Sequence, residues 1–142
     1  MPYDDEEPPF VEIDPQINKL TDAVIGAAYA VYKELGAGLD ESLYEAAMCK
    51  ELGFRGISYV CQAVFEVHYK GEKIGERRID LIVDGKLVIE LKAVESLLPL
   101  HKAQLLTYLK ITTRKLGLLI NFNSALLRDG IKRVINPTGT WN

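Results

Sequence analysis

Residues 78–92 predict a β-hairpin with charged side chains at fixed positions on its two strands. Asp84-Gly85 is a strong turn signal, and the residues on either side of it alternate in polarity. The apolar residues fall at odd-numbered positions: Ile79, Leu81, Val83, Leu87, Ile89 and Leu91. Asp80, Glu90 and Lys92 fall at even-numbered positions. Because successive side chains point to opposite faces of a strand, each strand separates an apolar face from a charged one.

The length of the turn decides whether the charged side chains share a face. Directly opposed residues of an antiparallel pair lie on the same face, so a two-residue Asp84-Gly85 turn would mix odd with even positions. An odd-length loop avoids this mixture, and Val83-Asp84-Gly85 with its glycine in the left-handed conformation is the natural candidate. We therefore expect Asp80, Glu90 and Lys92 to converge on one face.

Periodicity in the rest of the chain predicts an α/β domain. Residues 15–35 carry apolar side chains at helical spacing, with Asp14 as a candidate N-cap, Pro15 at the first position and Gly36 as the stop. Residues 116–122 form an apolar run typical of a strand buried on both faces. The expected elements are helices over 15–35, from after Asp40 to Gly53 and over 99–112, and strands over 59–69, both hairpin arms, 116–122 and, at an edge, 131–135. This order predicts a mixed sheet with helices packed on it.

The bulk properties suit one globular domain. The chain has 142 residues, of which 48% are hydrophobic and 26% are charged, and this is enough to build one core. Residues 1–14 are acidic and contain several prolines, so we expect a flexible tail before a single domain over 15–142. The formal net charge of −3 gives no global basic field, so a nucleic-acid substrate would be held by a local patch.

Cysteine usage and hydropathy favour a cytoplasmic protein. Cys49 and Cys61 are too few for a disulfide framework and have no zinc-ligand spacing, so we expect reduced thiols. No apolar run approaches the roughly 20 residues that span a bilayer, and the acidic start of the chain differs from an export signal.

The charged face of the hairpin suits a divalent metal. Asp80 and Glu90 offer hard oxygen ligands, and Mg²⁺ needs only one or two carboxylates because it keeps several waters. Mn²⁺ would also fit. Such a metal polarises a phosphoryl oxygen and lowers the pKa of a bound water, while Lys92 can orient the water or offset developing charge. These parts describe phosphodiester hydrolysis. The alternative is a surface ion-pair cluster on a half-exposed sheet.

Two helices add polar side chains near this face. On the helix after the hairpin, Gln104 and Tyr108 share a polar stripe and are suited to hold a phosphate or a water beside the metal, although such a stripe is commonly just the solvated side. Glu41 and Tyr44 lie on one side of the second helix, near its start. Glu41 either completes the metal site or, with Asp40 as the cap, only stabilises the start of the helix.

These residues resemble the PD-(D/E)XK nuclease superfamily, and within it a small bacterial family named after the motif Gly-x-x-Glu-x-x-Tyr. Gly38, Glu41 and Tyr44 match that motif. Gln104 and Tyr108 are similar to the Gln-x-x-x-Tyr motif of RecB-like nucleases. Each motif is weak by itself, and their order on the expected elements makes the resemblance specific.

The hairpin supplies the superfamily's central motif. Asp80 followed by Glu90-Leu91-Lys92 resembles its catalytic Asp and Glu-x-Lys. The similarity runs from about Gln16 to Ile135. One departure is Ile79, because the pattern that names the superfamily has proline before the aspartate.

The resemblance implies a restriction-endonuclease-like αβββαβ core, in which helices flank a central mixed sheet and an extra helix precedes it. It implies one or two divalent metals, Mg²⁺ or Mn²⁺. The implied catalytic residues are Asp80, Glu90 and Lys92, with Gln104 and Glu41 in support. The implied metal ligands are Asp80, Glu90, Glu41 and the backbone carbonyl of Leu91.

Two functions are compatible with these features. The first is a metal-dependent nuclease acting on DNA rather than RNA, and the second is a non-catalytic nucleic-acid-binding or protein-assembly module that retains the nuclease fold. Arg78 and Lys102 are the favoured phosphate contacts because they should lie near the carboxylates, with Tyr44 and Tyr108 as further substrate contacts. A homo-oligomer and a complex with a protein partner are both compatible with the sequence.

Overall fold

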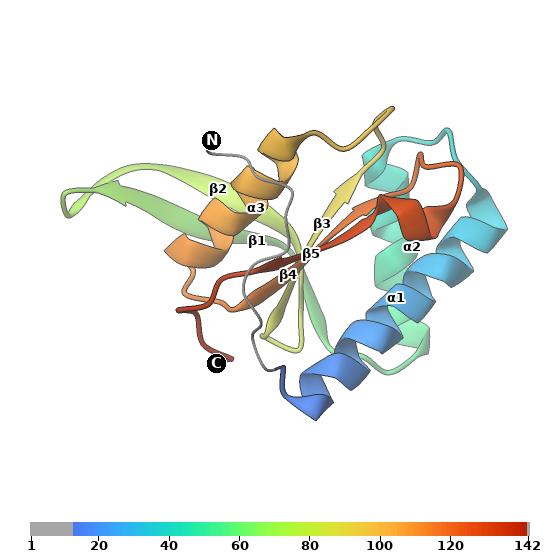
Figure 1. The fold of residues 1–142 in the computed structure, drawn as a ribbon, viewed down its shortest axis with the longest axis horizontal. Helices are drawn as coiled ribbons and strands as arrows, with labels where there is room; N and C mark the ends of the chain where they lie inside the picture. Colours follow the sequence, from blue (N-terminus) through green and yellow to red (C-terminus); the bar gives the residue numbers. More distant parts are fainter. Residues whose placement is uncertain (1–12, 142) are drawn as a thin grey trace.

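A five-stranded mixed sheet forms the centre of the protein (Figure 1). The computed structural model describes residues 13–141. The elements are α1 (Pro15–Leu35), α2 (Glu41–Phe54), β1 (Tyr59–Tyr69), β2 (Glu72–Val83), β3 (Leu87–Lys92), α3 (Pro99–Ile111), β4 (Leu116–Asn121), the 3₁₀ turn η1 (Leu127–Gly130) and β5 (Ile131–Ile135). This order confirms the predicted αβββαβ core, from α2 to β4, with α1 as the additional N-terminal helix.

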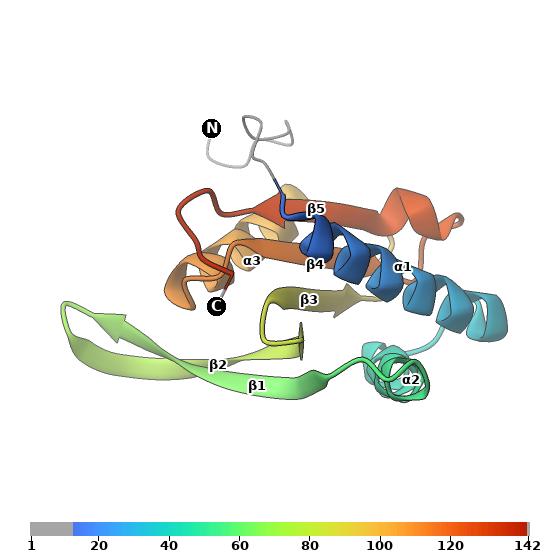
Figure 2. The same ribbon diagram turned by 90° about the horizontal axis from the view of Figure 1, so that it is seen from below.

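The strands follow one another in the sheet in chain order, from β1 to β5 (Figure 2). β3 and β4 pair in parallel, whereas the other neighbours pair antiparallel. A parallel neighbour requires a crossover, and α3 provides it between β3 and β4. The strand predicted over 131–135 is present at the sheet edge, and all six residues of β4 are buried, as predicted.

The caps of the first helix follow the prediction, whereas those of the second differ. Asp14 accepts a hydrogen bond from the backbone N–H of Gln16 at 2.7 Å, and Gly36 ends α1 with a φ of 67°. In the described chain, Asp40 precedes α2 without a capping hydrogen bond from its side chain, which corrects the expected cap. Its backbone carbonyl instead accepts from Leu43 and Tyr44. α2 continues one residue past Gly53.

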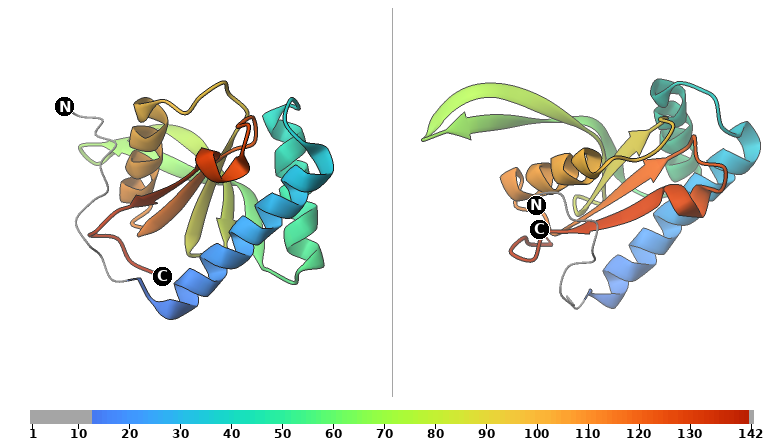
Figure 3. Two further views of the ribbon diagram at one scale, coloured as in Figure 1. Left: turned by 45° about the vertical axis from the view of Figure 1, so that its right-hand side comes forward. Right: turned by 45° about the horizontal axis from the view of Figure 1, so that its top comes forward.

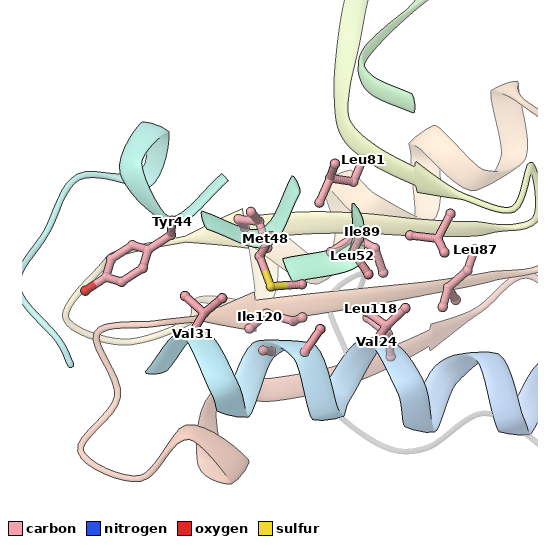
Figure 4. Packing of buried hydrophobic residues seen from close by; sticks show 14 of the residues in the cluster. Val24, Val31, Tyr44, Met48, Leu52, Leu81, Leu87, Ile89, Leu118 and Ile120 are labelled. Carbon is pink, nitrogen blue, oxygen red and sulfur yellow. The ribbon is translucent and has the colours of Figure 1, made fainter. Parts of the chain in front are cut away.

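Two hydrophobic layers hold the helices on the sheet. α1 and α2 cover one face, where Val24, Val31, Met48 and Leu52 pack against strand residues such as Ile89 (Figure 4). α3 covers the other face and forms a smaller cluster: Ile79, Ile82, Val88, Leu105, Leu109, Leu119 and Val134. Burying both faces of the central strands supplies most of the driving force for this three-layer arrangement.

The hairpin has the predicted odd register. Leu81 pairs with Ile89 and Val83 with Leu87. The loop consists of residues 84–86 rather than Val83-Asp84-Gly85, and the N–H of Lys86 donates to the carbonyl of Val83 at 3.0 Å. Both central residues of this turn have left-handed φ values, 53° and 67°. This conformation matches the twist of a hairpin, and Lys86 as the third loop residue keeps odd positions opposite odd positions.

One odd-numbered residue does not follow the predicted face. Ile79 belongs to the layer under α3, whereas Leu81, two positions later, belongs to the layer under α1 and α2. Gln62 on β1 has a φ of 53°, and within the described ladder β1 pairs with β2 on either side of Gln62 and Asp80 but not at that step. The two strands therefore change faces here, and beyond this point their arm projects past α3 (Figure 3).

Two further observations concern the ends of the chain and its helices. Of the tail predicted over 1–14, positions 1–12 lie outside the described residues, while Ile13 packs against the core and Asp14 caps α1.

Within residues 13–141, no helix is long and apolar enough to cross a membrane.

Candidate active site

Asp80 and Glu90 meet where β2 and β3 separate. The last paired residues of the two strands are Leu81 and Ile89, and the carboxylates occupy the next step. The backbone N–H of Asp80 donates to Glu90 Oε1 at 3.2 Å, and the N–H of Leu91 donates to Asp80 Oδ2 at 2.8 Å. Each carboxylate thus accepts a hydrogen bond from the opposite strand, which holds both acidic side chains in one place.

Glu90 is the carboxyl group of this pair whose pKa is strongly raised. Only 9% of the residue is exposed. Burial, followed by the negative charge of Asp80, raises the pKa of Glu90 to about 8, although the Asp80 N–H and the charge of Lys92 act in the opposite direction. Near neutral pH this carboxyl group therefore retains a proton unless a cation compensates its charge.

Lys92 lies one strand step after Glu90 and is half-buried. Its charge acts on Glu90 and also on His101 at the start of α3. Partial burial, followed by Lys92, lowers the pKa of His101, whereas Glu41 on α2 raises it. His101 Nδ1 accepts a hydrogen bond from the backbone N–H of Leu98 at 3.0 Å, so this histidine helps to cap α3.

α3 places the Tyr108 hydroxyl where the charges of Glu90 and Asp80 act on it, with Gln104 beside it. Gln104 Nε2 donates to the Tyr108 hydroxyl at 3.1 Å, and the tyrosine ring packs edge-on against Phe65 with centroids 5.0 Å apart. Burial and then the charge of Glu90 raise the pKa of Tyr108, while Arg77 lowers it. The hydroxyl therefore stays protonated and remains available as a hydrogen-bond donor near the carboxylates.

The structure adds two residues that the sequence did not single out. Glu45 on α2 accepts a hydrogen bond from Gln62 Nε2 at 2.6 Å, and the same nitrogen lies 3.4 Å from Asp80 Oδ1. Burial raises the pKa of Glu45, the hydrogen bond from Gln62 lowers it, and the charge of Asp80 raises it further. Glu45 lies one helical turn after Glu41, so its spacing offered a signal, whereas Gln62 offered none.

Two residues of the predicted Gly-x-x-Glu-x-x-Tyr motif, Glu41 and Tyr44, lie at the start of α2, and Gly38 lies in the loop before it. Glu41 is exposed at the first position of the helix, and within residues 13–141 no group of three or more His, Cys, Asp or Glu side chains could hold a metal. Tyr44 is 0% exposed and stacks on Phe122 at 4.5 Å. Its hydroxyl donates to the carbonyl of Gly36 at 2.5 Å and accepts from the N–H of Leu39. Tyr44 therefore anchors the loop between α1 and α2.

The two cations predicted to contact phosphate, Arg78 and Lys102, lie on β2 and α3. Arg78 is exposed and acts on the pKa of Glu76, whereas Arg77 is the arginine whose charge reaches Tyr108. The position of Arg77 follows from the change of faces at Gln62, which turns the odd positions of β2 before residue 80 toward α3. Lys102 is half-buried on the first part of α3.

Comparisons with known proteins agree with this architecture. A family model described as the PD-(D/E)XK nuclease superfamily matches residues 18–134. The crystal structure of SSO0001 is similar to the chain, with a TM-score of 0.53 and 20% sequence identity. That alignment covers 84% of this chain and 59% of the other, and at this identity it shows a shared fold. No protein of curated function matches significantly.

Proposed function

The chain belongs to the PD-(D/E)XK nuclease superfamily, and we propose that it is a metal-dependent phosphodiesterase that cleaves DNA. The observation that carries the proposal is the pair of hydrogen bonds through which β2 and β3 fix the carboxylates of Asp80 and Glu90 beside each other. Lys92 follows Glu90 at the spacing of a Glu-x-Lys motif, and its charge acts on the same site.

The donor atoms at this position suit a divalent cation. Asp80 and Glu90 offer hard carboxylate oxygens, and Mg²⁺ commonly binds one or two carboxylates while keeping several waters. Burial, followed by the charge of Asp80, raises the pKa of Glu90, so a bound cation would offset the cost of ionising this carboxyl group. We propose that Asp80, Glu90 and the backbone carbonyl of Leu91 hold Mg²⁺ or Mn²⁺. When bound, this ion would polarise a phosphoryl oxygen and lower the pKa of a water.

The remaining site residues would act directly on the phosphodiester. Lys92 would neutralise negative charge that develops on a phosphate oxygen. The Tyr108 hydroxyl would donate a hydrogen bond to a neighbouring phosphate oxygen, and Gln104, which donates to that hydroxyl, would orient it. Arg77 and Lys102, on β2 and α3, would hold the backbone of the nucleic acid, with Arg78 contributing from the outer side of the arm.

We also propose membership of the Gly-x-x-Glu-x-x-Tyr branch of the superfamily. Glu41 and Tyr44 support this assignment through their positions at the start of α2, where Tyr44 secures the preceding loop. In this proposal Glu41 is an accessory carboxylate at the margin of the site, because it shares His101 as a neighbour with Lys92. The free thiols Cys49 and Cys61 suit the reducing cytoplasm that we propose as its compartment.

Cleavage assays with a matched set of variants test the proposal. Linear, circular, single-stranded and double-stranded DNA, and RNA, would each be incubated with Mg²⁺, Mn²⁺ or EDTA. We expect DNA cleavage that requires metal, disappears in Asp80→Ala and in Lys92→Ala, and persists in Glu72→Ala, which removes an exposed carboxylate from the other end of β2. Unchanged cleavage in Asp80→Ala would overturn the site assignment. Nucleic-acid binding without cleavage or metal binding would support a non-catalytic module.

A further inference from the structure

Gln62 occupies an unusual position in β1. It lies inside a strand, it is not a glycine, and its φ is 53°. A left-handed backbone is costly for a residue with a side chain, and such residues concentrate at functional sites. Within the described β1–β2 ladder, the step that pairs Gln62 with Asp80 is missing, although the steps at Cys61 and Ala63 are in register.

The side chain of Gln62 replaces the missing backbone contact. Its amide nitrogen carries two hydrogens and lies between two carboxylates, 2.6 Å from Glu45 Oε1 and 3.4 Å from Asp80 Oδ1. The Leu91 N–H holds the other oxygen of Asp80, Oδ2. Gln62 therefore approaches the oxygen of Asp80 that the Leu91 N–H leaves unused, and it connects that oxygen to α2.

From this geometry we infer that Gln62 is a positioning residue for the metal ligand Asp80, with Glu45 holding the amide in place. The inference rests on the proposed function. A carboxylate that binds a metal needs a fixed orientation, and hydrogen-bonding partners behind the first ligands commonly supply it. The left-handed backbone at Gln62 serves this role because it interrupts the β1–β2 ladder and directs the side-chain amide toward Asp80.

The left-handed backbone at Gln62 also turns the β1–β2 arm toward α3, and this alone would explain the conformation. Gln62→Gly separates the two roles, since glycine adopts positive φ readily while the side chain that carries the amide is removed. Lys70→Gly is the matched control. Lys70 is also exposed and left-handed, with a φ of 49°, and it lies on the same arm at the distant turn.

Isothermal titration calorimetry with Mn²⁺ gives a readout that does not depend on cleavage. Relative to the wild type, we expect Gln62→Gly to weaken Mn²⁺ binding by roughly 10–100-fold, the range typical of groups that hydrogen-bond to a metal ligand. The melting temperature should be unchanged or higher. Lys70→Gly should bind Mn²⁺ as the wild type does. Equal Mn²⁺ affinity in Gln62→Gly and the wild type would overturn the inference. It would show that the left-handed backbone at Gln62 serves only to turn the β1–β2 arm toward α3.

Two further variants separate this inference from the proposed function. Asp80→Ala should abolish Mn²⁺ binding; if the wild type shows no binding that depends on Asp80, the proposed function fails and the inference fails with it. Glu45→Gln keeps an oxygen that accepts from Gln62, so its binding should weaken less than that of Gln62→Gly. A loss in Glu45→Gln as large as that in Asp80→Ala would make Glu45 a ligand and overturn the positioning role.

Discussion

Glu90 accepts a hydrogen bond from the backbone N–H of Asp80, the residue opposite it on the neighbouring strand, at 3.2 Å. Asp80 in turn accepts from the N–H of Leu91 at 2.8 Å. The two carboxylates therefore take the place of one step of backbone pairing between β2 and β3. Because backbone donors are rigid, this exchange gives each carboxylate one fixed hydrogen-bonding partner on the opposite strand.

This relationship predicts that Glu90→Gln removes metal-dependent activity while preserving or raising stability at alkaline pH. The pKa of Glu90 is about 8, above its ordinary value of 4.5, so the folded state binds this proton more tightly than the unfolded state. Wild-type stability should therefore fall as pH rises from 4.5 to 8, by up to about 1.4 kcal/mol per pH unit, and the glutamine variant should lack this component.

Urea denaturation of both proteins at pH 5, 7 and 8.5 without metal measures the effect. The free energy of unfolding of Glu90→Gln minus that of the wild type should increase with pH. A variant that is strongly destabilised at every pH would instead identify Glu90 as part of a structural ion pair with Lys92.

Tyr44→Phe should destabilise the fold and leave the proposed cleavage by the folded protein intact. The hydroxyl bonds to the carbonyl of Gly36 and the N–H of Leu39, and its loss leaves two backbone groups without their partner. We expect the free energy of unfolding to drop by about 1–3 kcal/mol. Tyr29→Phe is the control, since Tyr29 is 42% exposed. A normal stability with a large loss of cleavage would place Tyr44 in substrate binding.

Local pattern was sufficient to predict most of the fold. The strand over 59–69 coincides with β1, and the helix over 99–112 differs from α3 by one residue. The register of the hairpin followed from counting odd and even positions, because a one-residue slip would place charges in the core. These features depend on neighbours along the chain, so the sequence contains the information directly.

Features that depend on tertiary contacts were harder to predict from the sequence. Gln62 is a polar residue in a run of strand formers, and nothing in that run indicates a positive φ. Its conformation moves Ile79 to the layer under α3 and turns Arg77 to the side where its charge reaches Tyr108. Glu45 reaches Gln62 and Asp80 only because α2 packs beside β1 and β3, a contact that helix periodicity does not specify.

Tyr108→Phe should lower the rate of DNA cleavage by about tenfold or more, because a positioned hydrogen-bond donor is lost. The hydroxyl is only half-buried and its partner Gln104 is exposed, so the free energy of unfolding should change by less than about 1 kcal/mol. Phe65→Leu is the complementary variant, because it removes the ring contact and keeps the hydroxyl. We expect it to lose roughly 1 kcal/mol of stability with less effect on cleavage. Equal cleavage by Tyr108→Phe and the wild type would exclude a role for the hydroxyl.

Metal binding should release a proton near neutral pH. A carboxyl group must be deprotonated to bind a divalent ion, and the pKa of Glu90, about 8, means that the metal-free site holds a proton at pH 7. Calorimetry of Mn²⁺ binding in buffers of different ionisation enthalpy should therefore show about one proton released per bound ion at pH 7 and almost none near pH 9.5. Mn²⁺ affinity should rise over the same interval. Glu90→Gln provides the control, because it has no proton to release at this position. Proton release that stays near zero at both pH values would show that Glu90 is already ionised in the metal-free protein, so that burial and the charge of Asp80 do not raise its pKa.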